Sequence, residues 1–255
     1  MRYADRLDLQ RYLDRLLSRS ILTDEEQEAI LDLPCHYEKV RPNEDFVGLG
    51  EDVDQACLIV DGFAGRFDQS ANGARQITAI HVPGDMADMH SVVQTRTTSA
   101  LQALSLTTIM RIPHDAIRSA AARLPALAEA FWRDCMVDTA ILSQWVVNVG
   151  RRDAKARIRH LICEIATRLK APMEEGVIRF PFAVTQHQLA DATGLTAVHV
   201  NRILKALRDD GLAEVVRREV RILDWPGLVE AADFDRRYLQ VDVPPHDRPR
   251  ILALA

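Results

Sequence analysis

Short runs of alternating apolar and polar residues fill the first half of the chain, and each run ends at a glycine or another turn-forming residue. The runs cover residues 56–60, 65–68, 76–82 and 100–112. Asp61-Gly62 and Asn72-Gly73 stand between them, where glycine accepts the positive φ that a tight hairpin requires. Strands this short and closely spaced, over roughly residues 35–112, predict a β-roll or a barrel.

A broad apolar stripe, at steps of three and four residues, follows the strand region. Pro113 suits the first turn of a short helix through residue 122, and Pro125 begins a longer helix that runs to about residue 148. A small roll would leave much of so long a helix uncovered. We therefore favour pairing with the same helix of a second copy over packing on the chain's own roll. The predicted dimer contacts are Leu127, Phe131, Leu142 and Trp145.

A glycine among charged residues at 148–152 predicts a hinge after the long helix, and an amphipathic helix over residues 153–170 follows it. Two prolines and a glycine at 171–181 predict a loop or a short strand. The proline-rich tail is assigned no regular structure. The expected segments are a helical N-terminus over 1–24, the roll over 25–112, dimerisation helices over 113–149, a C-terminal domain over 150–240 and the tail over 241–255.

A capping box opens the most informative stretch of the chain. Thr185 with Gln188 three residues later satisfies backbone amides at the start of a helix. Ala190 is small where a second helix would cross the first, Gly194 permits a left-handed turn, and Thr196 caps the second helix. This spacing predicts a helix-turn-helix.

Two short strands at 213–216 and 220–223 follow the second helix and flank Arg217-Arg218. A helix-turn-helix followed by a hairpin is a winged helix. The coincidence of the glycine, the alanine, both caps and the wing favours this interpretation over an ordinary helical hairpin.

The outward face of the second helix predicts a function in DNA recognition. Arg202 can bind guanine O6 and N7 with two hydrogen bonds, and Asn201 can do the same for adenine. The predicted groove contacts are Thr196, Ala197, His199, Asn201, Arg202 and Lys205. The predicted phosphate contacts are Thr185, Gln186, His187, Arg217 and Arg218.

Charge is unevenly distributed along the chain. The net charge is −5, yet residues 151–223 hold 14 Lys+Arg against 9 Asp+Glu. A basic segment on an acidic chain is typical of a DNA-binding domain joined to an acidic partner domain.

Four cysteines lie far apart, which argues against a disulfide scaffold, a zinc ribbon or a clustered iron–sulfur site. We expect no metal and no cofactor. No stretch approaches the roughly 18 apolar residues of a membrane helix, and the charged N-terminus is not a secretory signal. A cytoplasmic protein with no membrane partner is therefore expected.

Residues 189–204 read LADATGLTAVHVNRIL. This segment resembles the recognition segment of the Crp/Fnr family of bacterial transcription regulators, with Arg202 at the arginine that members usually keep. The resemblance covers roughly residues 25–225. It implies an α+β fold with an N-terminal jelly-roll of the cyclic-nucleotide-binding (cNMP-binding-like) type, a long dimerisation helix and a C-terminal winged helix-turn-helix. Val198 stands where members carry an acid, so the operator should differ from the best-known consensus.

The resemblance also implies an effector pocket in the roll, where family members hold a ribose with an acid and a cyclic phosphate with an arginine. The matching positions here are Met89 and Thr98, which cannot do that chemistry. Asp88 and Arg96 lie nearby, and a shifted alignment would place them there. His81, His90 and Met89 would be candidate ligands if the roll held haem. The candidate effector residues are Asp88, Met89, Arg96, Thr98 and Ser99.

Together these features predict a sequence-specific transcription regulator that binds a pseudo-palindromic operator as a homodimer, with recognition helices roughly 34 Å apart. Expected partners are double-stranded DNA, a second copy, RNA polymerase and a small-molecule effector of unknown identity, not cyclic AMP. The alternative is a ligand-binding regulatory module whose winged helix contacts protein. An enzyme is not expected, because the sequence has no phosphate loop, metal-ligand cluster or GxSxG motif.

Overall fold

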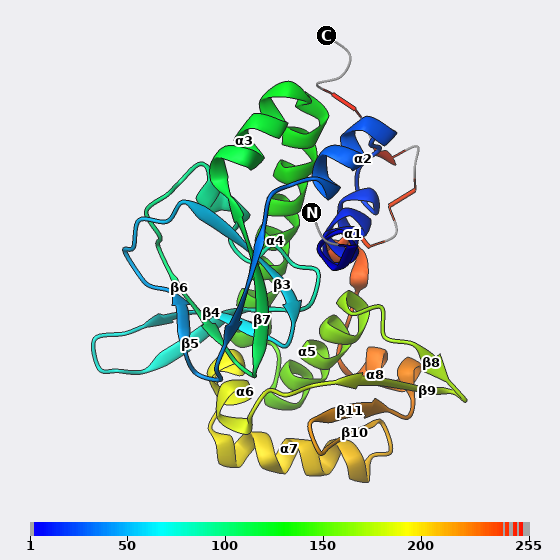
Figure 1. Ribbon diagram of the computed structural model, residues 1–255. Helices are drawn as coiled ribbons and strands as arrows, with labels where there is room; N and C mark the ends of the chain where they lie inside the picture. The colour runs from blue at the N-terminus through cyan, green and yellow to red at the C-terminus, as the bar shows by residue number, and fades with distance from the viewer. Residues whose placement is uncertain (1–2, 242, 245–246, 249, 252–255) are drawn as a thin grey trace.

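The computed structural model describes residues 3–241, 243–244, 247–248 and 250–251. Figure 1 shows a β-roll on one side of the long helix α4, two N-terminal helices on the other side, and a C-terminal domain at the lower end of the molecule. The N-terminal helices are α1 (Tyr3–Leu17) and α2 (Asp24–Leu31). In the part of the chain that is described, no helix combines the length and the apolar character that crossing a bilayer requires.

The roll consists of two antiparallel sheets, with strand orders β1-β7-β3 and β2-β6-β4-β5. Apolar side chains from both sheets, including Val47, Ile59, Leu101 and Ile109, form one buried cluster. The elements are β1 (His36–Val40), β2 (Asp45–Val47), β3 (Gln55–Asp61), β4 (Ala64–Gln69), β5 (Arg75–His81), the 3-10 helix η1 (Met89–Val92), β6 (Ala100–Ala103) and β7 (Thr107–Pro113). The predicted roll and the α+β fold are confirmed.

The run at 100–112 is two strands rather than one, and β6 and β7 belong to different sheets. The chain changes sheets at the turn between them, where the Ser105 hydroxyl accepts a hydrogen bond from the Phe63 backbone amide at 3.0 Å. Gly62 has φ +84, and a Cβ there would lie 2.4 Å from the Leu106 carbonyl oxygen. Only glycine fits this turn.

Helices α3 (His114–Arg123) and α4 (Pro125–Arg151) connect the roll to the C-terminal domain, whose first helix is α5 (Ala154–Arg168). The long helix runs past its predicted end near residue 148, because α4 continues through Gly150 to Arg151, and of the predicted hinge at 148–152 only the last residue lies outside the helix. Glycine costs only about 1 kcal/mol inside a helix. The break comes at Arg152, and Asp153 then caps α5 by accepting a hydrogen bond from the Ala156 amide at 2.9 Å.

Three of the four predicted dimer contacts on α4 are wrong. Leu127, Phe131 and Trp145 are at most 5% exposed, buried within this chain, whereas Leu142 is 44% exposed. Phe131 stacks on Tyr12 of α1 with ring centroids 6.5 Å apart. The N-terminal helices thus pack on Leu127 and Phe131, and α5 packs on Trp145.

The C-terminal domain surrounds a sheet with strand order β10-β11-β9-β8. The segment at 171–181, predicted as a loop or short strand, forms two strands that extend the wing. The elements are β8 (Met173–Glu174), β9 (Val177–Pro181), α6 (Gln186–Thr193), α7 (Ala197–Asp209), β10 (Ala213–Val216), β11 (Glu219–Ile222), α8 (Trp225–Ala231) and the 3-10 helix η2 (Arg236–Leu239).

A buried ionic junction joins this domain to the rest of the molecule. Asp85, in the turn after β5, pairs with Arg15 of α1 and Arg168 of α5. Burial raises the pKa of the Asp85 carboxyl, but the two guanidinium groups outweigh burial and hold that pKa at about 2. Arg15 also pairs with Asp134 of α4 at 2.8 Å. Helices α1, α4 and α5 are therefore held to the roll at one point.

Glu164 of α5 extends the junction into the C-terminal domain. Its carboxylate accepts hydrogen bonds from the Trp145 indole at 3.1 Å, the Tyr238 hydroxyl at 2.9 Å and Arg168 at 3.1 Å. Burial raises its pKa, and these three donors act in the opposite direction.

The described tail residues are tied to the N-terminal helices, although no structure was assigned to them from sequence. Arg248 donates to the Leu17 carbonyl at 2.7 Å, and Arg250 pairs with Glu26 at 2.8 Å. Residues 242, 245–246, 249 and 252–255 of the tail lie outside the described residues.

Replacing Glu164 tests the junction. Glu164→Ala should lower the free energy of unfolding by about 3–5 kcal/mol, because it leaves a buried guanidinium without one of its partners. Tyr238→Phe removes one hydrogen bond to a charged group and should cost about 1.5–3 kcal/mol. The exposed Glu230→Ala is the control and should change little. Urea denaturation monitored by circular dichroism measures all three, and equal stability of Glu164→Ala and wild type would contradict this account.

Candidate functional site

The capping box predicted at the start of α6 is present. The Thr185 hydroxyl accepts a hydrogen bond from the Gln188 amide at 3.2 Å, and the Gln188 side chain accepts one from the Thr185 amide at 2.8 Å. Gly194 ends α6 in the left-handed conformation, with φ 64 and ψ 37. Thr196 then caps α7 by accepting from the His199 amide at 3.2 Å. The predicted helix-turn-helix is confirmed.

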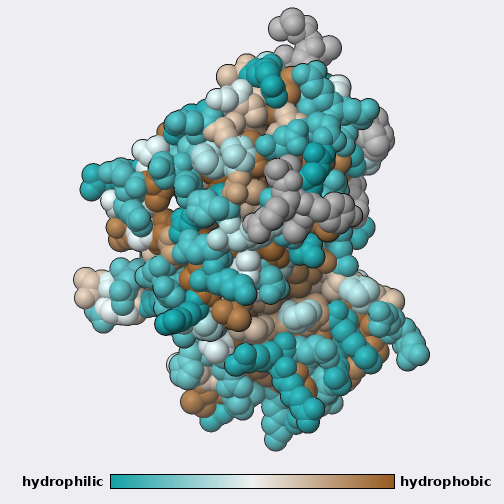
Figure 2. Space-filling view, in the orientation of Figure 1, coloured by the Kyte–Doolittle hydropathy of each residue, from teal (hydrophilic) through white to brown (hydrophobic). Residues whose placement is uncertain are grey.

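The inner face of α7 consists of Val200, Ile203 and Leu207, all buried. The remaining face is exposed and largely polar, and Figure 2 shows hydrophilic colour over much of this lower end of the molecule. The sequence of α7, AVHVNRILKALRD, has no acidic residue before its last position. The structure places every predicted contact on the surface: Thr185, Gln186, His187, Thr196, His199, Asn201, Arg202, Lys205, Arg217 and Arg218 are exposed, and Ala197 is half-buried.

Two predicted contacts touch one another. The Asn201 amide donates to the Gln186 side chain at 3.2 Å, which joins the start of α6 to the middle of α7. Arg202 and Lys205 form no ion pair with any described residue, so both cations face solvent.

The tip of the wing is strained. Val216 pairs with Glu219, which leaves a two-residue turn of Arg217 and Arg218 with φ values of 52 and 66. Both residues of such a turn are left-handed, a conformation that Asn-Gly adopts far more readily. Arginine at both positions costs stability and places two cations on the protruding hairpin. A strained charged tip indicates a role outside the fold.

Sequence reasoning missed the contact between α6 and the roll. The Gln188 amide group donates to Asn43 at 3.2 Å and to the Leu104 carbonyl at 3.1 Å. Gln76 of β5 donates to the Ala192 carbonyl at 3.3 Å. Polar side chains in loops and strands carry no sequence signal for such a long-range contact. The first helix of the helix-turn-helix therefore rests directly on the roll.

A cavity of about 370 Å³ lies between the roll and α4. Thr98 and Ser99 line it, as expected, together with Arg66, His90 and Asp138. Burial lowers the pKa of His90 to about 4, so its ring is neutral near pH 7. Burial also raises the pKa of Asp138 to about 6, against the opposing effect of Arg15.

Three predicted effector residues do not line this cavity. Asp88 is buried and accepts a hydrogen bond from the Cys57 amide at 2.7 Å. Met89 packs in the apolar core, and Arg96 is exposed in a bridge with Asp52. Arg66 of β4 supplies the cation instead. An alignment anchored on the turn after β5 could not identify this arginine, because Arg66 lies on β4.

Two family models match the chain. The cyclic nucleotide-binding domain matches residues 37–123, and the Crp-like helix-turn-helix domain matches residues 156–231. Together they cover more than half of the chain, in the order that the fold shows. The chain belongs to the Crp/Fnr family of transcription regulators.

Relatives within the Crp/Fnr family are distant. The transcriptional activator protein FnrL of Cereibacter sphaeroides is 24% identical over 221 residues, covering 83% of this chain and 86% of that protein. The transcriptional regulatory protein btr of Bordetella pertussis is 25% identical over 162 residues, covering 63% of this chain and 66% of that protein. The structure of FixK2 from Bradyrhizobium japonicum matches with a TM-score of 0.70 at 21% identity, covering 78% of this chain and 98% of that one.

Relaxing the wing turn should stabilise this Crp/Fnr chain. Arg217→Asn with Arg218→Gly should raise the free energy of unfolding by about 1 kcal/mol, because both replacements accept the left-handed conformation. Arg217→Lys with Arg218→Lys keeps the strain and should leave stability unchanged. Urea denaturation at matched ionic strength compares the two variants, and no difference between them would show that the turn stores no strain.

Proposed function

We propose that this Crp/Fnr chain is a sequence-specific transcription regulator that binds a pseudo-palindromic DNA site as a homodimer. The observation that carries the proposal is the exposed, acid-free face of α7, with Arg202 and Lys205 free of ion pairs among the described residues. Members of the family bind DNA through the helix-turn-helix, and the N-terminal part of its second helix enters the major groove.

Within this proposal, the exposed residues divide into two groups. Ala197, His199, Asn201 and Arg202 face the groove and read base edges. Thr185, Gln186 and His187 at the start of α6, and Arg217 and Arg218 on the wing, contact phosphates and fix the register. Val198 is 65% exposed on the same face and suits an apolar contact such as a thymine methyl group.

The proposed dimer uses a face of α4 different from the one expected. Trp132, Met136 and Val146 are 59%, 65% and 63% exposed. Together with the exposed Thr139 and Ser143, they recur at steps of four and three residues, which is the spacing of a coiled-coil seam. The two small polar residues in the middle would let the helices approach closely. A second copy of α4 would cover this row and hold two α7 helices about one DNA turn apart.

The proposed effector binds the cavity between the roll and α4, beside Arg66, Thr98 and Ser99. The Arg66 guanidinium suits an effector that carries an anionic group. Asp88 points into the roll, so the acid that family members offer to a ribose is missing from its usual element, and cyclic AMP does not fit well. RNA polymerase and a cytoplasmic location belong to the proposal through family membership.

Arg202 provides the sharpest test of DNA recognition. Arg202→Ala should weaken binding to the selected site by about 1–3 kcal/mol and relax discrimination at one base pair in each half-site. The control Arg123→Ala removes an exposed arginine from α3 and should change neither. Selection from random duplex DNA supplies the site, and titration at fixed salt measures affinity. Unchanged site preference in Arg202→Ala, or no enrichment of any sequence, would favour a winged helix that contacts protein.

The dimer face is tested on the same full-length chain. Met136→Glu and Val146→Glu should each shift the protein to the mass of one chain, because like charges would meet across the seam. Leu49→Glu is the control, since Leu49 is 68% exposed on the roll and far from α4 in sequence. Light scattering after size-exclusion chromatography measures the mass. A dimer that survives both α4 substitutions would exclude this seam.

A further inference from the structure

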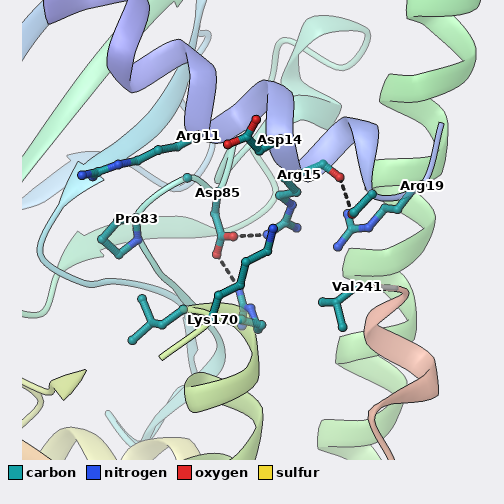
Figure 3. Close-up of a pocket in the computed structure, with 12 residues that line it drawn as sticks. Arg11, Asp14, Arg15, Arg19, Pro83, Asp85, Lys170 and Val241 are labelled. Atoms are coloured by element: carbon teal, nitrogen blue, oxygen red, sulfur yellow. Dashed lines mark hydrogen bonds and ion pairs between the residues drawn. The ribbon is translucent and has the colours of Figure 1, made fainter. Parts of the chain in front are cut away.

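A second cleft, of about 330 Å³, lies where α1, the turn after β5 and the end of α5 meet. Figure 3 shows Arg11 and Arg15 on α1 and Arg19 in the turn after it, with Asp85 and Lys170 on the facing elements. Within the described part of the chain, this cleft and the roll cavity share no lining residue. Its cationic side chains are Arg11, Arg15, Arg19, Arg168 and Lys170.

The inner cations of the cleft are already paired. Asp85 holds Arg15 and Arg168, and Asp134 behind the cleft holds Arg15 and Arg19. These contacts fix the floor of the cleft. They also neutralise most of its charge, so any attraction for a ligand must come from the rim.

The rim carries an excess of positive charge. Arg11 and Lys170 form no ion pair with any residue that the structure describes, and both are exposed. Among the described residues, the Arg11 guanidinium donates only to the Val60 carbonyl, at 3.1 Å. Asp14 is the rim carboxylate and accepts a hydrogen bond from Gln10 at 2.8 Å. The rim thus carries two cations that lack an ion pair among the described residues, Arg11 on α1 and Lys170 after α5, and one carboxylate.

Two deeper arginines retain unused donors. The Nε atoms of Arg19 and Arg168 are buried and have no hydrogen-bond partner among the described residues. Each side chain is only 5% exposed. An unpaired buried donor is costly, so a ligand or an ordered water that reaches either group would relieve that cost.

We propose that this cleft binds a small, multiply charged oxyanion, a phosphate ester or a polycarboxylate of a few carbon atoms, between Arg11 and Lys170. Arginine and lysine both bind such groups by charge-assisted hydrogen bonds. The volume lies at the lower end of the roughly 300–1,000 Å³ typical of ligand pockets, which excludes a dinucleotide. The anion replaces the missing partners of the rim cations.

The position of the cleft gives its ligand a regulatory consequence. Arg11 belongs to the N-terminal helices, Pro83 to the sensor turn and Lys170 to the C-terminal domain. A ligand that touches all three favours the arrangement in which they are together. This consequence rests on the proposed DNA-binding function, whereas binding of the anion does not.

Calorimetry on the full-length protein without DNA tests the site, with pyrophosphate and citrate as probes at constant ionic strength. We expect a Kd below about 1 mM for at least one probe, and a loss of at least about tenfold in Arg11→Gln with Lys170→Gln. A preference for pyrophosphate assigns the site to phosphate esters, and a preference for citrate assigns it to polycarboxylates.

The matched control is Lys39→Gln with Arg41→Gln, which removes two exposed cations from the roll. It should keep wild-type affinity, and circular dichroism should show that both double variants fold. The proposal would be overturned if neither probe bound at a concentration of 10-fold the expected Kd. It would also be overturned if the Arg11/Lys170 double variant kept full affinity, or if the control lost as much affinity as that variant. Because no DNA is present, failure here is distinct from failure of operator binding.

Discussion

The contact between Asp85 and two arginines controls how the parts of this molecule are placed. Asp85 is buried in the turn after β5, while Arg15 and Arg168 come from helices that are far apart in the sequence. Removing three charged groups from water is expensive unless each finds its partners. Asp134 and Glu164 complete the set, from α4 and α5. The junction therefore favours the arrangement in which the roll, the N-terminal helices and the C-terminal domain meet at this point.

Local signals in the sequence predicted the local structure well. The capping box of Thr185 and Gln188, the left-handed Gly194 and the hairpin around Arg217 all depend on residues close in sequence. Their geometry follows from backbone requirements that few residue types meet. For the same reason the strands of the roll were found from alternation and glycine turns, although the sheet change between β6 and β7 was not.

Contacts between distant segments could not be predicted in the same way. The stripe on α4 shows that the helix has an apolar side, but Leu127, Phe131 and Trp145 are covered by other parts of the same chain. Which side stays free depends on where α1 and the C-terminal domain pack. The prediction of the effector residues was wrong for a related reason. Arg66 reaches the cavity from β4, which lies well before the aligned segment in the sequence. Long-range packing decides both questions.

Gln188 uses its two side-chain atoms for separate purposes. Its oxygen completes the cap of α6, and its nitrogen holds α6 to Asn43 and Leu104 on the roll. Breaking the second set of bonds leaves the first intact, so the helix pair can detach from the sheet without fraying at its first turn. The pair of α6 and α7 can therefore move as a rigid body. Exchange of its amide hydrogens need not accelerate when the pair leaves the sheet.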